Sequence, residues 1–321
     1  MPLIRRSSYP GAPFYQFNGH LQTILPAFRK LRDIPPYERE RLELPDGDFL
    51  DLDWVDRKSK QLVILSHGLE GNSDRRYIRS MAKAFARKGW DILAWNCRSC
   101  SGEMNRNLRL YNHGEIEDIG SVIAHALRTK HYEEVVLIGF SMGGSISLKY
   151  TGVNAGTLPE VITKVIAFST PVDLASSVGL LDQTQNAFYR YRFFRSLKAK
   201  LTEKDKQHPG VIDISNFDRV KKWTDFDEFF SAPINGYENA QDFYHKASAI
   251  HFMDAINIPT LLVNAKNDPI LSPECYPTSF CENHPFIYLE QPKEGGHVGF
   301  SLGRNVDPWA DFRALEFVGI S

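Results

Sequence analysis

The feature that most constrains this chain is a short apolar run that leads directly into a glycine-rich turn. Residues 135–140 read Val-Val-Leu-Ile-Gly-Phe and predict a buried strand. The hexapeptide Gly139-Phe140-Ser141-Met142-Gly143-Gly144 overlaps its end, and a helix is expected to begin near Met142. A buried strand that passes through a tight turn into a helix is the building unit of a parallel sheet covered by helices.

The same alternation recurs along the rest of the chain. Helices are predicted over 75–88 and 115–129, and strands over the apolar runs 62–66, 91–95, 165–168, 260–265 and 286–289. A hairpin is predicted from 41–44 and 49–54, which flank an Asp46-Gly47 turn. Strands that alternate with helices pair in parallel through right-handed crossovers. The sequence therefore predicts an α/β fold with a mostly parallel central sheet flanked by helices.

Two segments depart from this rhythm and define the expected domain organisation. Residues 174–244 are rich in aromatic and basic residues without a clear strand pattern, which predicts a helical cap inserted between two strands. Residues 1–40 have no sustained periodicity and are expected to form an arm that packs on the core. The remaining residues, 41–173 and 245–321, are then expected to form one α/β domain built on the central sheet.

The glycine-rich turn fits the pattern G-x-S-x-G, in which a serine is the candidate nucleophile. Ser141 would lie on a strained strand-to-helix turn, where its neighbours must be small and where the positive end of a helix dipole is close. A phosphate-binding loop is excluded because Ser145 stands where that motif requires lysine. A glycine-rich packing turn without chemistry stays open as the alternative.

A serine hydroxyl needs a base, and the base needs an orienting acid. In this type of fold the three residues follow in the order serine, acid, histidine. Asp268 follows the predicted strand 260–265, and His297 lies in a glycine-rich loop after the strand 286–289. Asp173, after the strand 165–168, is the rival acid.

Two backbone N–H groups are expected to stabilise negative charge on a substrate oxygen. One belongs to Met142, directly after the candidate nucleophile, and the other to Leu69 in the loop after the strand 62–66. His67, in the same loop, is expected to brace it rather than to take part in chemistry. His113 and Asp118 are expected to cap or brace the start of the helix 115–129.

Several motifs together resemble the YheT-type branch of the α/β hydrolases. They are Asn18-Gly19-His20-Leu21-Gln22-Thr23, His67-Gly68-Leu69-Glu70-Gly71, Cys100-Ser101-Gly102, His113-Gly114, Gly139–Gly144, Ser231-Ala232-Pro233-Ile234-Asn235-Gly236-Tyr237 and Asn267-Asp268-Pro269. Relatives of that branch include lipid esterases, phospholipases and alcohol acyltransferases that act on medium-chain acyl groups. The resemblance implies a triad of Ser141, Asp268 and His297 in this sequence.

These observations predict a serine hydrolase that cleaves carboxylic esters of short- to medium-chain acyl groups through an acyl-enzyme. An alcohol acyltransferase would use the same intermediate and stays open. A non-catalytic binding protein on a hydrolase scaffold is the alternative of another class, although an intact triad disfavours it. The expected partner is a small ester or lipid. Neither a cofactor nor a metal is required by this chemistry.

Net charge, apolar segments and cysteine content argue against several other classes of protein. The formal net charge of −1 provides no field that would attract nucleic acid. The first residues lack the apolar core of a signal peptide, and no apolar run reaches the length of a membrane span. Four cysteines, including a Cys97-Arg98-Ser99-Cys100 pair without a second pair at zinc spacing, predict neither a disulfide framework nor a metal site. A cytoplasmic location is expected, and the oligomeric state is left open.

The aromatic and basic residues of the cap segment allow two interpretations. Residues 190–206 have seven basic and two acidic side chains, beside a predicted stripe of Phe188, Tyr191, Phe194 and Leu201. The stripe is expected to pack the cap onto the core, with a peripheral membrane contact through 188–206 as the alternative. Part of the aromatic surface of the cap is expected to roof Ser141 and form an acyl channel.

Overall fold

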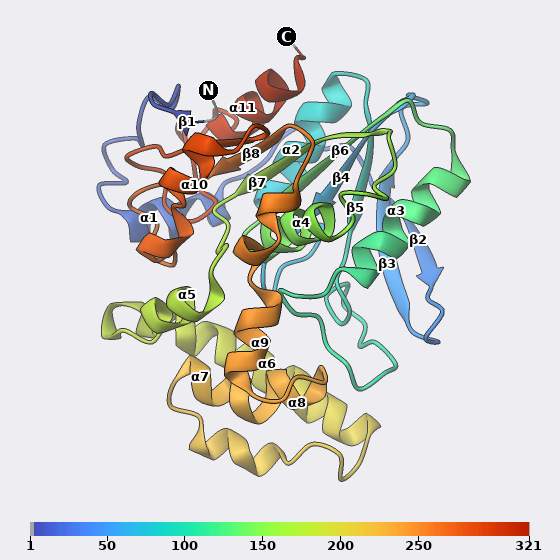
Figure 1. Cartoon of the computed structure of the whole chain (residues 1–321), viewed down its shortest axis with the longest axis vertical. Coiled ribbons are helices and arrows are strands. Elements are labelled where there is room, and N and C mark those ends of the chain that lie inside the picture. Colours follow the sequence, from blue (N-terminus) through green and yellow to red (C-terminus); the bar gives the residue numbers. More distant parts are fainter. Residues whose placement is uncertain (1–2, 321) are drawn as a thin grey trace.

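The computed structural model describes residues 3–320 and contains a nine-stranded sheet (Figure 1). In sheet order the strands are β1 (Leu3–Ile4), β9 (Ile287–Glu290), β8 (Thr260–Val263), β7 (Ile162–Phe168), β6 (Glu134–Phe140), β4 (Gln61–Ser66), β5 (Asp91–Trp95), β3 (Phe49–Val55) and β2 (Glu38–Glu43). The strands from β1 to β5 pair in parallel, and the β2–β3 hairpin is attached antiparallel to β5. The predicted fold class is confirmed.

The sheet is covered on both faces, which explains its nearly continuous apolar strands. Along β6, Val135 and Leu137 belong to one hydrophobic cluster, whereas Val136 and Ile138 belong to another. The first cluster includes residues of α3 (Glu117–Thr129) and α4 (Met142–Val153), and the second includes residues of α2 (Arg76–Arg87) and α11 (Trp309–Val318). Because side chains alternate along a strand, both sets must be apolar when helices cover both faces.

The amino-terminal segment adds two elements that periodicity did not reveal. β1 extends the sheet beyond β9, with Leu3 opposite Leu289. Farther along, α1 (Gly19–Ile24) begins at Asn18, whose side chain accepts a hydrogen bond from the Leu21 N–H at 2.9 Å. Both elements are too short to produce a recognisable repeat in the sequence.

Between β7 and β8 the chain leaves the sheet and forms a group of helices, seen in yellow to orange below the sheet in Figure 1. They are α5 (Leu174–Leu181), α6 (Ala187–Gln207), α7 (Trp223–Phe226), α8 (Ala232–Ile234) and α9 (Ala240–Ala247). A third hydrophobic cluster, which includes Val178, Leu201 and Phe230, lies among them. We refer to these helices as the cap.

The predicted stripe on the cap segment is wrong for Phe188 and Tyr191 but correct for Leu201, which is buried, and for Phe194, which packs against the hydrophobic cluster of the cap. Phe188 and Tyr191 are 57% and 68% exposed, whereas Tyr189, Leu197 and Leu201 are buried. These three buried residues of α6 recur at multiples of four residues, which keeps them on one helical face. Helix α6 has more apolar residues than its buried face contains, so residue spacing alone could not predict which of them are buried.

Candidate active site

Ser141 forms the connection between β6 and α4. Its backbone has φ 54° and ψ −120°, a strained conformation for a residue with a side chain. A Cβ at Gly139 would lie 2.2 Å from the Gly143 carbonyl oxygen, and one at Gly143 would lie 2.2 Å from the Ser66 oxygen. Side chains at these positions would therefore prevent the turn from closing against β4.

The structure brings Ser141, His297 and Asp268 together. The Ser141 Oγ lies 2.9 Å from His297 Nε2, and His297 Nδ1 lies 2.8 Å from Asp268 Oδ2. The other oxygen of Asp268 accepts a hydrogen bond from the Ile270 N–H at 2.9 Å, and the carboxylate is buried. When the Nδ1–H of His297 donates a hydrogen bond to Asp268, Nε2 carries no proton and can accept a hydrogen bond from the serine hydroxyl.

Asp173, the rival acid, has a different structural role. It is the N-cap of α5, where its Oδ1 accepts hydrogen bonds from the Ser176 N–H at 3.0 Å and the Ser176 hydroxyl at 2.6 Å. These contacts satisfy free N–H groups at the start of a helix. Asp268, rather than Asp173, therefore lies beside the histidine.

The loop after β4 passes directly over the serine turn. A Cβ at Gly68 would lie 3.1 Å from the Ser141 Cβ, so the two backbones approach closely. The Met142 N–H is the first of α4 and has no acceptor within the helix. Among residues 3–320, the Leu69 N–H also makes no hydrogen bond to another protein group. Both groups are thus available to a ligand near Ser141.

His67 braces this loop, as predicted. Its Nε2 accepts a hydrogen bond from the Cys97 N–H at 3.0 Å, and its Nδ1 lies 2.8 Å from the Gly68 carbonyl oxygen. The ring is therefore neutral, with the proton on Nδ1. Burial lowers the pKa of His67 to about 4, which keeps it uncharged at neutral pH.

Glu70 connects the same loop to the cap. Its carboxylate accepts hydrogen bonds from the Tyr111 hydroxyl, the Ser196 hydroxyl and the Lys200 ammonium, the last at 2.7 Å. Its N–H donates to Tyr111 Oη at 3.1 Å, and its carbonyl oxygen accepts from Arg75. Burial raises the pKa of Glu70, but these partners outweigh it and hold the pKa below its usual range. Every polar group of the residue after Leu69 is therefore fixed.

The amino-terminal arm supports the loops of Asp268 and His297, a role that sequence reasoning missed. Gln22 Oε1 accepts hydrogen bonds from the Asn267 side chain and the Gly295 N–H, both at 2.8 Å. The Thr23 hydroxyl accepts from the His297 N–H at 2.9 Å. The polar motif 18–23 inside an otherwise aperiodic arm was the available signal. His20 of this motif lies 3.1 Å from the Tyr189 hydroxyl of the cap.

Ser141 and His297 open into a large cleft between the cap and the sheet domain, which we call the Ser141 cleft. Its volume is about 1020 Å³. The cap contributes aromatic side chains to it from the first half of α6, including Phe188, Tyr189 and Phe193. The cap aromatics that lie near Ser141 are therefore those in the first half of α6.

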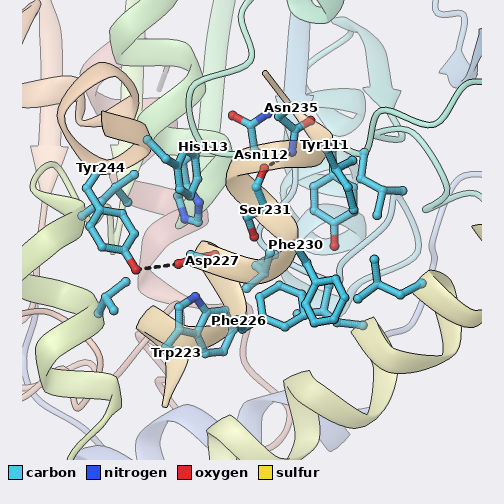
Figure 2. Close-up of a pocket in the computed structure, with 18 residues that line it drawn as sticks. Tyr111, Asn112, His113, Trp223, Phe226, Asp227, Phe230, Ser231, Asn235 and Tyr244 are labelled. Atoms are coloured by element: carbon cyan, nitrogen blue, oxygen red, sulfur yellow. Dashed lines mark hydrogen bonds between the residues drawn. The ribbon is translucent and has the colours of Figure 1, made fainter. Parts of the chain in front are cut away.

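Other cap aromatics line a second, smaller cavity of about 60 Å³, which lies where the cap meets loops of the sheet domain and which we call the cap cavity (Figure 2). Trp223, Phe226 and Phe230 contribute to its wall, and Leu69 lines both this cap cavity and the Ser141 cleft. His113 also lies in its wall and has no hydrogen bond to residues 3–320, so it does not cap α3. Burial lowers the pKa of His113 to about 4.

Asp227 faces the same cap cavity from a short π-helical turn, Asp227–Ser231. Its Oδ2 accepts a hydrogen bond from the Tyr244 hydroxyl at 2.8 Å, the dashed line in Figure 2. Burial raises the pKa of Asp227 to about 7, because few partners compensate for the lost hydration.

The remaining sequence candidates have structural roles. Asp118 forms a buried two-point ion pair with Arg98, which also contacts Asp46 and Asp48. Cys97 and Cys100 are buried free thiols, and burial raises both pKa values. No group of three metal-binding side chains with suitable geometry occurs among the described residues. No helix within residues 3–320 combines the length and low polarity needed to cross a bilayer.

Comparison with known proteins identifies the family of this chain. The family model described as “alpha/beta hydrolase fold” matches residues 61–303. “Putative esterase YheT” of Escherichia coli (strain K12) is 32% identical, with 94% of this chain and 90% of that protein covered. “Phospholipase ABHD3” of Bos taurus is 25% identical, with 94% and 75% covered. The solved Pyrococcus furiosus esterase Pf2001 has a TM-score of 0.59 at 17% identity, covering 90% of this chain and 98% of that one.

The match extends from β4 through the loop of His297, and therefore includes the serine turn and the loops on both sides of it. The match also contains the cap, and the alignment to the YheT protein, which covers 94% of the chain, extends the likeness into the amino-terminal arm. The resemblance seen in the sequence motifs is confirmed. This chain belongs to the α/β-hydrolase family, in its YheT-like branch.

Proposed function

We propose that this protein is a serine hydrolase that cleaves carboxylic esters, with Ser141 as nucleophile, His297 as general base and acid, and Asp268 as the orienting carboxylate. The observation that supports this most is the unbroken series of contacts from Ser141 Oγ to His297 Nε2 at 2.9 Å and from His297 Nδ1 to Asp268 Oδ2 at 2.8 Å. The names of the similar proteins, an esterase and a phospholipase, support the same class of reaction.

The reaction would begin with proton transfer from the Ser141 hydroxyl to His297 as the oxygen attacks the ester carbonyl. Buried Asp268 would stabilise the imidazolium that forms and keep Nε2 directed at the serine. His297 then protonates the leaving alcohol. Water, deprotonated by the same histidine, attacks the acyl-enzyme and releases the acid, so that the free enzyme is restored.

The Met142 and Leu69 N–H groups are the proposed donors to the oxyanion. Both lie on backbones that meet at Ser141, and neither N–H is used within the protein framework described above. Donors held in place before the reaction stabilise the developing charge without a cost of reorganisation. Their contribution would therefore fall mainly on kcat.

For the substrate we propose short- to medium-chain acyl esters. The Ser141 cleft has an apolar wall formed by Ile24, Phe188, Phe193 and Ile270. Each methylene that enters such a wall contributes about 0.8 kcal/mol until the space is filled. An alcohol acyltransferase would share every step up to the acyl-enzyme, and differs only in whether water or an alcohol attacks it.

The test combines covalent labelling with a series of aryl esters of increasing acyl length. A fluorophosphonate probe is expected to label the protein at Ser141, and Ser141→Ala is expected to lose both labelling and ester cleavage. Ser279→Ala, which removes an exposed hydroxyl, serves as the matched control. Labelling that persists in Ser141→Ala would refute the assignment. Values of kcat/KM should rise over several carbons and then fall, and ester formed with added ethanol would reveal acyl transfer.

A further inference from the structure

The Ser141 cleft collects positive charge that the proposed ester chemistry does not use. Six arginines line it together with Ser141 and His297: Arg29, Arg75, Arg76, Arg79, Arg192 and Arg195. Only two carboxylates, those of Glu70 and Asp74, are among its lining residues. The whole chain has a formal net charge of −1, so this local excess is not the consequence of a generally basic protein.

Neighbouring carboxylates form ion pairs with some of these arginines, the first part of the charge, and leave others unpaired. Two ion pairs belong to the first part: Arg29–Asp307 at 3.1 Å and Arg79–Asp74 at 3.3 Å. Glu70, the other lining carboxylate, is paired at 2.7 Å with Lys200, which does not line the cleft. Arg76, Arg192 and Arg195 form no ion pair with any residue between positions 3 and 320. These three side chains are exposed within the lining of the cleft.

Two of the free arginines are directed into the cleft by the geometry of α6. The residues of α6 that line the cleft include Phe188, Arg192, Arg195, Ser196 and Ala199. They recur at intervals of four, three, one and three residues, which places them along one face of the helix. Buried Leu197 and Leu201, by contrast, do not line the cleft and belong to the hydrophobic cluster of the cap.

Free guanidinium groups in a concave site favour one class of ligand. A guanidinium matches the geometry of carboxylate and phosphate oxygens and binds them through two parallel hydrogen bonds. A cleft lined by one sign of charge also raises the local concentration of the opposite sign. A neutral ester would use neither property.

We propose that the Ser141 cleft selects esters that carry a carboxylate or phosphate group away from the scissile bond, and that Arg192 and Arg195 bind this anionic group. The inference rests on the proposed esterase function and specifies its substrate class. The arginines line the same cavity as Ser141, so a single ester can contact both within one cavity. Arg76, at the start of α2 on the sheet domain, would contribute from the opposite wall.

The test compares esters that differ only in an anionic group. Mono-4-nitrophenyl adipate is paired with 4-nitrophenyl hexanoate, which places the charge on the acyl side. On the alcohol side, 4-carboxyphenyl hexanoate is paired with phenyl hexanoate. For at least one pair, kcat/KM is expected to favour the charged ester. In the double variant R192Q/R195Q this preference should fall about ten- to hundredfold, as expected for lost hydrogen bonds to a charged group.

The matched control is K198Q/K206Q, which removes two positive charges from the same helix outside the lining of the cleft. It should keep the preference, whereas R192K/R195K should keep only the part that depends on charge, because lysine cannot form the two parallel hydrogen bonds of a guanidinium. The preference should also decrease as ionic strength rises. Equal losses in R192Q/R195Q and the control, or no preference in either pair, would overturn the proposal.

A binding measurement separates this proposal from the esterase function itself. Affinities of the same esters for Ser141→Ala, measured by calorimetry, report recognition without turnover. If no ester is cleaved by the native protein but charged esters still bind more tightly, the esterase proposal fails and the anionic site stands. If R192Q/R195Q instead loses binding to phosphatidylglycerol vesicles while ester selectivity is unchanged, the arginines serve a membrane surface and the proposal is wrong.

Discussion

Ser141 illustrates how a single residue can be held in a costly conformation by its surroundings. Its positive φ would be relieved in a freer chain, but β6 fixes one side of it and α4 the other. The glycines on either side remove the side chains that would collide with β4 and with the helix itself. Strain of this kind, of about 1–3 kcal/mol, persists only where the surrounding packing prevents the backbone from relaxing.

The residue-scale prediction concerns the acid. Asp268→Asn is expected to lower kcat by about four orders of magnitude, because an amide at this position stabilises the wrong tautomer of His297 and cannot balance its charge. Asp173→Asn should change both kcat and stability little, since that residue caps α5 and asparagine caps a helix about as well as aspartate. Measured kcat values for both variants decide between the two acids. The reverse ranking would contradict the assignment.

At the scale of elements, the loop after β4 and helix α6 are joined through one buried carboxylate. Glu70 connects to Ser196 and Lys200 of α6 and to Tyr111, which in turn accepts the Glu70 N–H. The neighbouring residue along the chain is Leu69, whose N–H is a proposed oxyanion donor. The position of the cap and the position of this donor are therefore mechanically linked.

The element-scale prediction follows from this link. Glu70→Gln leaves the Lys200 ammonium without its counter-charge and loosens the loop, so kcat is expected to fall about ten- to hundredfold, a part of what the loss of an oxyanion donor costs. The KM should change less than kcat. Glu203→Gln, which alters an exposed partner of Lys206 on the same helix, is the control. A loss of thermal stability with unchanged kcat would reduce Glu70 to a purely structural role.

At the scale of the whole molecule, the cap has a hydrophobic cluster of its own and also includes a buried acid with a raised pKa. In the unfolded chain Asp227 would ionise near its usual value of about 4, whereas burial raises its pKa in the folded protein to about 7. Nearby Asp182 adds to the shift. Between these values the unfolded chain releases a proton that the folded protein keeps. Raising the pH through this range therefore favours unfolding.

The corresponding prediction is a pH-dependent gain in stability for Asp227→Asn. The amide keeps an acceptor for the Tyr244 hydroxyl and has no proton to lose. The difference in free energy of unfolding between variant and native protein should grow by about 2 kcal/mol from pH 5 to 7 and level off above about pH 8. Urea titrations at several pH values measure it, with the exposed Asp218→Asn as control. If the stabilities of variant and native protein change in parallel with pH, Asp227 ionises as readily in the folded protein as in the unfolded chain.

The sequence by itself determined the α/β sheet and the identities of Ser141, Asp268 and His297 as candidates. Those features depend on local order: apolar runs mark strands, and glycines mark the turn on which the serine lies. The contacts of Gln22, Thr23 and Glu70 depended on the tertiary structure, because their partners are more than 40 residues away in the chain and polar residues leave no periodic trace. The inward face of α6 was likewise decided by packing, since a helix with apolar residues on several sides can bury more than one of them.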